Sequence, residues 1–147
     1  MQTVIRQMQK KDASAVYAIS QACHLGTWSL QSYEQESENP VAYYAVAEAD
    51  KAIAGFAGIW CVADEAQVMN VGVLPEYRGK GLGEALMRAM IAQSLQVGCT
   101  SMTLEVKDGN EPAIRLYQKL GFATEGVRKN YYSDHSDGFL MRRLAVE

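Results

Sequence analysis

The glycine-rich segment at positions 78–83 has the residue types and spacing of a binding loop. It reads Arg-Gly-Lys-Gly-Leu-Gly, and it lies between the run Asn70–Val73 and a helical pattern that begins at Leu82. Glycines leave consecutive backbone N–H groups uncovered, and a helix N-terminus adds roughly half a positive charge. Arg78 and Lys80 add side-chain charge. The segment therefore predicts an anion site, and a pyrophosphate is its natural ligand.

The glycine spacing argues against two other phosphate-binding motifs. A Walker loop has four residues between its glycine and Gly-Lys, and then Ser or Thr. Here six residues separate Gly72 from Gly79, and Gly81 follows the lysine. A Rossmann fingerprint needs Gly-x-Gly-x-x-Gly, and the spacing to Gly83 is too short for it. A glycine-rich turn with solvated charges remains the structural alternative.

Two more side chains with useful chemistry follow this loop. Residues 101–106 alternate polar with apolar positions, which is typical of a strand with one polar face, and Glu105 is a carboxylate on that face. Asn110 can cap the next helix, in which Tyr117 lies one turn after Ala113. By pattern alone, Glu105 could equally be an exposed charge on an edge strand. Tyr117 could be a core aromatic.

Periodicity and turn residues predict the elements that must position these groups. The expected order is β-α-α-β-β-β-α-β-α-β-β. The expected strands are 4–8, 41–49, 53–62, 67–73, 101–106, 123–127 and 138–144, and the expected helices start after Asp12, after Ser29, at 82–96 and after Asn110.

The order of these elements predicts the kind of sheet. Consecutive middle strands favour antiparallel pairing, and the helix between 67–73 and 101–106 favours one parallel pair. We expect an α/β (α+β) fold: a mixed, twisted sheet of about six to seven strands with four helices on its two faces. Gly55 and Gly58 interrupt the strand 53–62 and indicate a bulge or a close approach.

Composition narrows the class of protein. The chain has 147 residues, 48% of them apolar and 21% charged, which predicts one globular domain over residues 1–147. A net charge of −3 argues against nucleic-acid binding. Three cysteines and two histidines show no metal-ligand spacing, and no apolar run is long enough to cross a membrane. We expect a reduced, cytoplasmic protein without a metal ion.

The loop at 78–83 resembles the Arg/Gln-x-x-Gly-x-Gly/Ala signature of the GNAT acetyltransferases. Residues 70–77 look like the strand and turn that lead into that signature, and residues 104–107, 110–113 and 116–122 are similar to the family's second half. The resemblance covers nearly the whole chain and agrees with the expected strand order. It implies the GNAT acyl-CoA N-acyltransferase fold, acetyl-CoA as cofactor, and transfer of an acetyl group to a primary amine.

Within that family, one group is more similar. Trp28-Ser29, the Leu-Glu-Val at 104–106 and the Arg-Lys-Asn-Tyr-Tyr at 128–132 resemble the bacterial RimI-type enzymes. These acetylate the N-terminal alanine of a small-subunit ribosomal protein. The resemblance therefore implies a protein N-terminus as the substrate, with direct transfer in a ternary complex.

The resemblance also implies roles for single residues. Glu105 would be the base, directly or through one water, and Tyr117 the acid that protonates the leaving thiolate. An α-amine has a pKa of about 8 and a lysine amine one of about 10.4. One ordinary carboxylate can therefore deprotonate an α-amine more easily than a lysine. Three aromatic residues would line a peptide groove, or they only pack against other parts of the protein: Trp28, Tyr131 and Tyr132. The residues expected at the cofactor are Val71, Gly72, Val73, Arg78, Gly79, Lys80, Gly81, Leu82, Gly83, Glu84 and Asn110.

Two other functions stay open at this point. The same fold could acetylate a small amine, such as a polyamine, an amino acid or an antibiotic. Glu34, Glu36 and Glu38 could supply carboxylates for a polyamine, although they spread over different faces of a helix. The third possibility is a non-catalytic acyl-CoA-binding module, which would not need Glu105 and Tyr117 together.

Overall fold

The computed structural model describes residues 2–25 and 28–144. Within them the chain forms one seven-stranded sheet in the order β1-β2-β3-β4-β5-β7-β6, and only β4 and β5 pair in parallel. The expected mixed sheet with four α-helices is confirmed. The elements are β1 (Thr3–Gln7), η1 (Lys10–Asp12), α1 (Ala13–Ala22), α2 (Leu30–Glu36), β2 (Ala42–Ala49), β3 (Ala52–Val62), β4 (Glu65–Val73), η2 (Pro75–Tyr77), α3 (Leu82–Gln96), β5 (Ser101–Lys107), α4 (Glu111–Lys119), β6 (Ala123–Arg128) and β7 (Gly138–Leu144).

The expected helix caps are only partly correct. The Ser29 side chain accepts a hydrogen bond from the backbone N–H of Ser32, as an N-cap should. Asp12 and Asn110 stand at N-cap positions but make no capping hydrogen bond with their side chains. Asp12 instead accepts two hydrogen bonds from the Arg6 guanidinium, because a charged, bidentate donor is the stronger partner.

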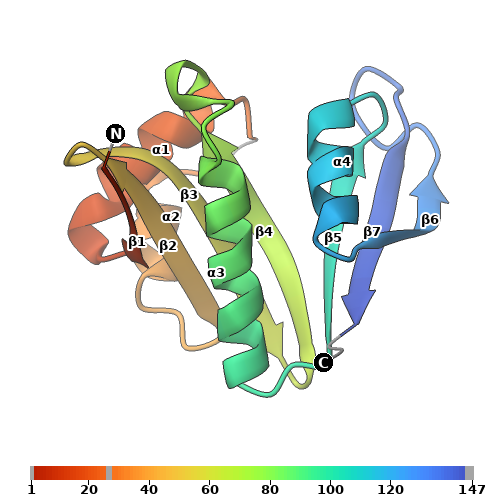
Figure 1. The fold of residues 1–147 in the computed structure, drawn as a ribbon, viewed down its shortest axis with the longest axis horizontal. Coiled ribbons are helices and arrows are strands. Elements are labelled where there is room, and N and C mark those ends of the chain that lie inside the picture. The colour runs from red at the N-terminus through yellow and green to blue at the C-terminus, as the bar shows by residue number, and fades with distance from the viewer. Residues whose placement is uncertain (1, 26–27, 145–147) are drawn as a thin grey trace.

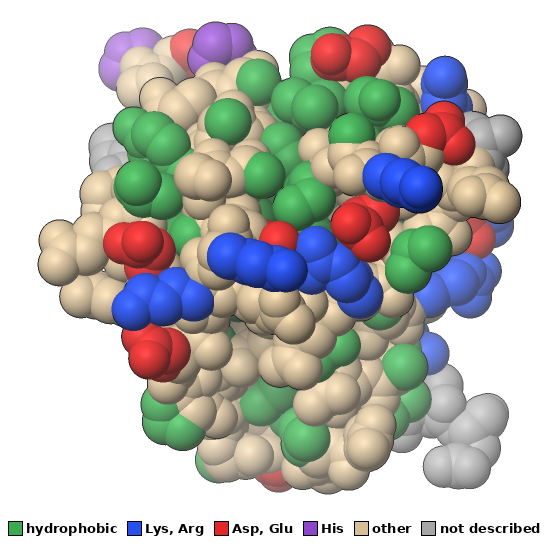
Figure 2. All heavy atoms as spheres, turned by 90° about the vertical axis from the view of Figure 1, so that its left-hand side faces the viewer, with side chains coloured by type: hydrophobic (Ala, Val, Ile, Leu, Met, Phe, Trp, Pro, Cys, Tyr) green, Lys and Arg blue, Asp and Glu red, His purple; other side chains and the backbone are tan. Residues whose placement is uncertain are grey.

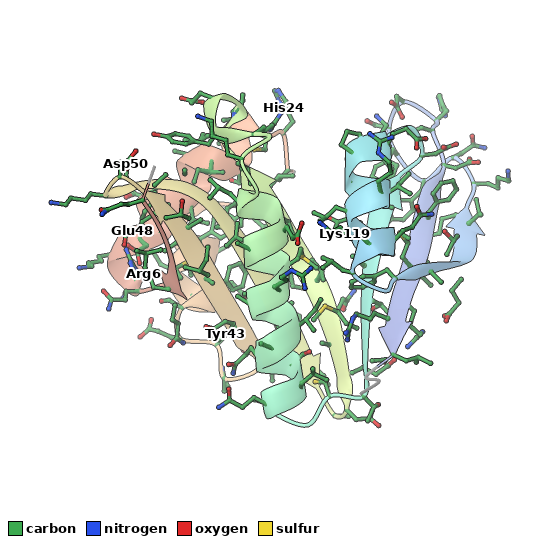
Figure 3. The ribbon with its side chains drawn as sticks, viewed as in Figure 1. Arg6, His24, Tyr43, Glu48, Asp50 and Lys119 are labelled. Carbon is green, nitrogen blue, oxygen red and sulfur yellow. The ribbon has the colours of Figure 1, made fainter. Side chains whose placement is uncertain are left out.

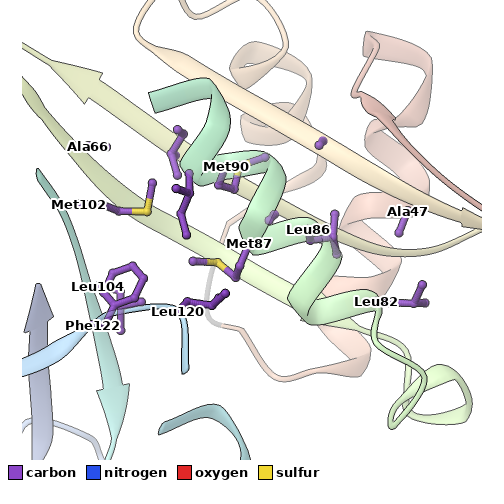
Figure 4. Packing of buried hydrophobic residues seen from close by; sticks show 14 of the residues in the cluster. Ala47, Ala66, Leu82, Leu86, Met87, Met90, Met102, Leu104, Leu120 and Phe122 are labelled. Carbon is purple, nitrogen blue, oxygen red and sulfur yellow. The ribbon is translucent and has the colours of Figure 1, made fainter. Parts of the chain in front are cut away.

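Helices cover both faces of the sheet, and each face has its own apolar core (Figure 1). On the face of α3, Leu86 lies against Gly55 of β3, and Met87 lies on the side of Leu104 and Leu120, as Figure 4 shows. On the opposite face, α1 and α2 pack on β2 and β3 through Val16, Ile19, Tyr33, Tyr44 and Phe56. The sheet is thus packed between two apolar cores, one on each face.

The middle of the sheet opens between β4 and β5. The two strands pair only from Glu65–Gln67 to Ser101–Thr103, and beyond this short ladder they diverge (Figure 1). A bulge at Met69 bends β4 at the point where the strands part, because the register with β3 shifts there. The second half of β4 therefore has a free edge toward β5.

The free edge of β4 exposes the backbone of two valines. The N–H of Leu74 donates to Ala54 on β3 at 2.8 Å. Since successive residues of a strand turn their N–H and C=O groups to opposite sides, Val73 and Val71 direct theirs away from β3 and into the gap. The backbone groups of Val71 and the N–H of Val73 are therefore available to a ligand between β4 and β5, whereas the Val73 oxygen accepts hydrogen bonds from Arg78 and Cys23.

Gly58 marks both a bulge and a close approach, as expected from the sequence. The register shift falls next to it, and it pairs with Tyr44 on one side and with Asn70 on the other. The Tyr44 ring lies across Gly58, since a Cβ at this position would be 2.2 Å from ring atoms of Tyr44. Position 58 therefore requires glycine, because the Tyr44 ring occupies the space that a Cβ would need.

Gly58→Ala should lower the free energy of unfolding by about 2 kcal/mol, because a core aromatic must move to admit the methyl group. Urea unfolding followed by fluorescence measures this. Gly126→Ala on β6 is the matched control, since its Cβ would meet its nearest neighbour only at 4.0 Å. Equal unfolding midpoints for the two variants would contradict the close approach.

Charges of opposite sign mix on the surface. On the face shown in Figure 2, Lys and Arg side chains lie beside Asp and Glu. Arg6 pairs with both Asp12 and Glu48, and Lys10 with Glu38. This face lacks the continuous basic stripe of a nucleic-acid binder. In the part of the chain that the structure describes, no helix is both long and apolar enough to cross a membrane.

Candidate active site

The glycine loop leads into the N-terminus of α3. Gly79 and Gly81 have φ angles of 77° and 84°, a left-handed conformation that side chains rarely adopt. Gly81 is the N-cap of α3, and a Cβ on Gly79 or Gly81 would meet nothing within 4 Å. The backbone N–H groups at the start of α3 have no partner inside the helix. The loop thus presents bare amides to open space, which is the geometry of an anion site.

A cleft of about 790 Å³ extends from this loop to α4, and we call it the α3–α4 cleft. One wall is the free edge of β4, and the other is the first half of α4. All the residues expected at the cofactor line it except Lys80. The Lys80 ammonium instead lies 5.8 Å from the centre of the Tyr77 ring. The expected cofactor residues are therefore brought together, apart from one.

Arg78 lines the α3–α4 cleft and also makes two contacts within the protein. Its Nε donates to the backbone oxygen of Val73 at 3.0 Å, and its Nη2 lies 3.4 Å from the sulfur of Cys23. The Cys23 thiol also donates to the Val73 oxygen. The guanidinium thereby fastens the loop to β4 and to the end of α1. No sequence pattern marked Cys23 as part of this region.

Glu84 links the two walls of the cleft. It stands in the first turn of α3 and forms ion pairs with Lys119 at 2.8 Å and with Arg88 at 2.9 Å. Figure 3 shows Lys119 reaching from α4 toward α3 across the gap between the two halves of the molecule. These cations hold the pKa of Glu84 below its usual value. The carboxylate is therefore engaged within the protein rather than free for a ligand.

A second hollow of about 480 Å³ lies where β4 and β5 diverge, and we call it the central hollow. Glu105, Tyr117, Asn110, Asn70 and Tyr132 all line it. It shares Asn110 and Tyr117 with the α3–α4 cleft, so the two spaces adjoin. A third, outer hollow of about 220 Å³ shares Glu105 with the central one and includes Tyr131. The three spaces therefore follow one another from the glycine loop past Tyr117 to Glu105.

β5 lies between β4 and β7 in the sheet, but at Glu105 only β7 pairs with it, so this part of β5 has a free edge toward the gap. The Glu105 side chain is 25% exposed and pairs with Arg128, whose Nε is 3.1 Å from Oε1. Leu104 and Val106 point into the core under α3, so Glu105, which lies between them, faces the α1–α2 side of the sheet. The carboxylate is thus oriented and accessible from the hollow.

Tyr117 approaches the same space from α4. Its ring packs against Phe122 with the centroids 5.9 Å apart. Burial raises the pKa of the Tyr117 phenol above its usual value, and the neighbouring Tyr132 adds to the shift. The hydroxyl is therefore protonated at neutral pH and can donate a proton or a hydrogen bond.

The β6–β7 loop carries two of the three aromatic residues expected at a peptide groove. Tyr131 and Tyr132 meet edge to face at 5.1 Å, and Arg128 lies 5.5 Å from the Tyr131 ring centre. The Tyr131 hydroxyl interacts with Glu105, and this interaction raises the pKa of Tyr131. Trp28 does not line the three spaces described above and packs on Tyr33 at 5.4 Å. Its place in a groove stays a prediction.

Two residues at the site were not predicted. Arg128 belongs to the Arg-Lys-Asn-Tyr-Tyr motif at 128–132, but no spacing rule links it to Glu105. Asn70 is a polar residue in the otherwise apolar end of β4, between Met69 and Val71, and this contrast was the signal that could have identified it. Arg128 contacts the carboxylate and Asn70 lines the same hollow, because the sheet brings segments that are distant in the sequence to one place.

Comparison with known proteins places this geometry among acetyltransferases. The model of the acetyltransferase (GNAT) family matches residues 13–122. A Bacillus subtilis protein with the provisional name ribosomal protein bS18-alanine N-acetyltransferase is 39% identical over 143 residues, which are 97% of this chain and 95% of that protein. The crystal structure of the ribosomal-protein-S18-alanine N-acetyltransferase from Escherichia coli superposes with a TM-score of 0.90 at 30% identity, covering 99% of this chain and 96% of that one. A Salmonella typhimurium structure with its cofactor acetyl-CoA has the same fold, with a TM-score of 0.85 at 23% identity over 100% of this chain and 96% of that chain.

Proposed function

Because the chain belongs to the GNAT family of acetyltransferases, we propose that it acetylates the N-terminal alanine of a protein, and that this protein is ribosomal protein bS18. The chain is an acetyl-CoA-dependent N-acetyltransferase. The substrate is inferred from the names of relatives that match nearly their whole length. The observation that carries the proposal is that Glu105 and Tyr117 line one hollow at the divergence of β4 and β5. We further propose a single domain that acts in the cytoplasm.

The residues of the α3–α4 cleft fit acetyl-CoA. The bare amides at Gly79, Gly81 and the start of α3 suit the diphosphate, because oriented N–H groups and the helix dipole favour anions. The Val71 backbone groups and the Val73 N–H on the free edge of β4 suit the amides of the pantetheine arm, which would pair there as a further strand does. Acetyl-CoA supplies the acetyl thioester that is transferred.

Glu105 and Tyr117 divide the proton transfers between two faces of the sheet. Glu105 faces the α1–α2 side and takes a proton from the amine, directly or through one water. An α-amine needs little help, since its pKa lies near about 8. Tyr117 belongs to α4 on the other side, next to the cleft, and its phenol protonates the departing sulfur. The ordinary pKa values of a phenol and a thiol make this step uphill by about 2 kcal/mol, and the raised pKa of Tyr117 adds to this cost. A good hydrogen bond to the sulfur offsets part of it.

The carboxylates Glu34, Glu36 and Glu38 do not favour the small-amine alternative. Glu36, the last residue of α2, is only 9% exposed and accepts hydrogen bonds from the Trp60 indole at 2.6 Å and from Asn39. Glu38 lies beyond the end of α2 and pairs with Lys10. A polyamine site needs free carboxylates close together, and two of these three have partners within the protein.

A substrate panel tests the proposal. Purified protein, acetyl-CoA and a peptide with the first residues of bS18 should give a product acetylated only at the N-terminus, read by tandem mass spectrometry. The same peptide with a blocked N-terminus, free alanine amide and spermidine are the competing substrates. A Glu105→Gln, Tyr117→Phe double variant is the control for chemistry at this site. Faster turnover of the free amines than of the peptide, or undiminished product from the double variant, would overturn the assignment.

A further inference from the structure

A row of side chains crosses three strands beside the central hollow. Tyr44 on β2 pairs with Gly58 on β3, and Gly58 pairs with Asn70 on β4. Because Gly58 has no side chain, the Tyr44 ring lies over it and extends from β2 toward β4. The bulge at Met69 directly precedes Asn70. This row places Asn70 against a buried aromatic wall.

Tyr33 from α2 completes this wall. Its ring is fully buried and meets the rings of Tyr44 and Phe56 edge to face, at 6.4 Å and 5.7 Å. The Asn70 Nδ2 donates to the Tyr33 hydroxyl at 3.4 Å. Burial raises the pKa of both phenols, so both rings stay uncharged at neutral pH. The amide nitrogen of Asn70 is thus directed into the core.

The other end of the carboxamide has no such partner. Among residues 2–25 and 28–144, no donor makes a hydrogen bond to the Asn70 Oδ1. With Nδ2 turned toward Tyr33, the planar group leaves Oδ1 as the acceptor that remains. Asn70 is partly exposed and lines the central hollow. An unpaired carbonyl oxygen at the wall of a site is suited to an N–H donor.

Asn70 and Glu105 stand on the same face of the sheet on opposite sides of the gap. Asn70 packs with Tyr33 on the α1–α2 face, whereas its neighbour Val71 joins the core under α3. Glu105 faces the α1–α2 side for the same reason of alternation. An amine that enters the central hollow from this face meets an oxygen acceptor on each strand.

We propose that Asn70 is a substrate-binding residue whose Oδ1 accepts a hydrogen bond from the incoming amine, and that Tyr33 is a positioning residue that holds it. The proposal rests on the acetyltransferase function above and names one more contact of the same site. A neutral amine has two N–H groups and one lone pair. With one N–H bonded to Asn70 and the other to Glu105, directly or through a water, the lone pair points into the gap between β4 and β5, where the acetyl group is transferred.

Asn70→Ala should raise the KM for an alanine-starting peptide about tenfold or more, because a hydrogen bond to a charged or reacting amine is lost. The KM for acetyl-CoA should not change. A desamino version of the peptide, in which propionyl replaces the first alanine, should bind the variant and the wild type equally in calorimetry. Tyr33→Phe should raise the peptide KM in the same direction but less, and it keeps the buried ring in place.

Tyr17→Phe on α1 is the matched control, since this tyrosine borders the same core without touching Asn70. A wild-type peptide KM in Asn70→Ala would overturn the proposal, and so would an equal loss of affinity for the desamino peptide. If Asn70→Ala does not fold, the same readouts on Tyr33→Phe decide, and a KM equal to that of Tyr17→Phe counts against it. If the wild type acetylates no peptide, the proposed function has failed first, which is a separate result.

Discussion

Gly81→Val should weaken the binding of CoA and acetyl-CoA by about 100-fold, since at least two hydrogen bonds to a charged group are lost. Gly81 is the N-cap of α3 and has a φ angle of 84°. A β-branched residue is strongly disfavoured in that conformation, so the loop must change and its amides no longer converge on one point. Titration calorimetry with CoA measures the effect, because it needs no turnover.

The control for this variant is Gly98→Val. Gly98 has a φ angle of 91° in the turn after α3, and a Cβ there also meets nothing within 4 Å. The two substitutions introduce the same kind of backbone strain, of about 1–3 kcal/mol in stability. Of these two glycines, Gly81 lines the α3–α4 cleft and Gly98 does not. Equal CoA affinities in the two variants would show that the loop is not the diphosphate site.

Glu105→Gln should lower kcat for an alanine-starting peptide by about 100-fold or more at pH 7, the usual contribution of a positioned base. The amide keeps the size of the side chain but cannot take a proton. The deficit should narrow as the pH rises through about 8, because the α-amine then loses its proton to solvent. Rate against pH for the two proteins, at saturating acetyl-CoA, measures both effects.

Glu125→Gln separates loss of the base from loss of an ion pair. Glu125 on β6 pairs with Arg142 at 2.8 Å, as Glu105 pairs with Arg128 at 3.1 Å. Both substitutions therefore remove a carboxylate from an arginine, but only Glu105 lines the hollows that contain Tyr117 and Tyr131. Glu125→Gln should keep the wild-type rate. A similar loss of rate in both variants, or a constant deficit across the pH range, would remove Glu105 from the role of base.

Local rules predicted most of the fold. The alternation in 101–106, the helical period from Leu82 and the turn residues between strands each report on a few neighbouring positions, and all of these elements are present. The one parallel pair followed from the helix between β4 and β5. The glycine loop was recognised for the same reason. Its amides, its positive φ angles and the helix that follows are consecutive in the chain.

The sequence by itself therefore determined the elements, their order and an anion-binding loop, because local conformation depends on adjacent residues. Only the tertiary structure decided what surrounds Glu105: Arg128 from β6, Tyr117 from α4 and Asn70 from β4. It also placed the Arg78 guanidinium on the backbone oxygen of Val73. These contacts depend on the divergence of β4 from β5 and on a tyrosine that lies across Gly58. Contacts between distant segments are set by packing, which no short window of sequence records.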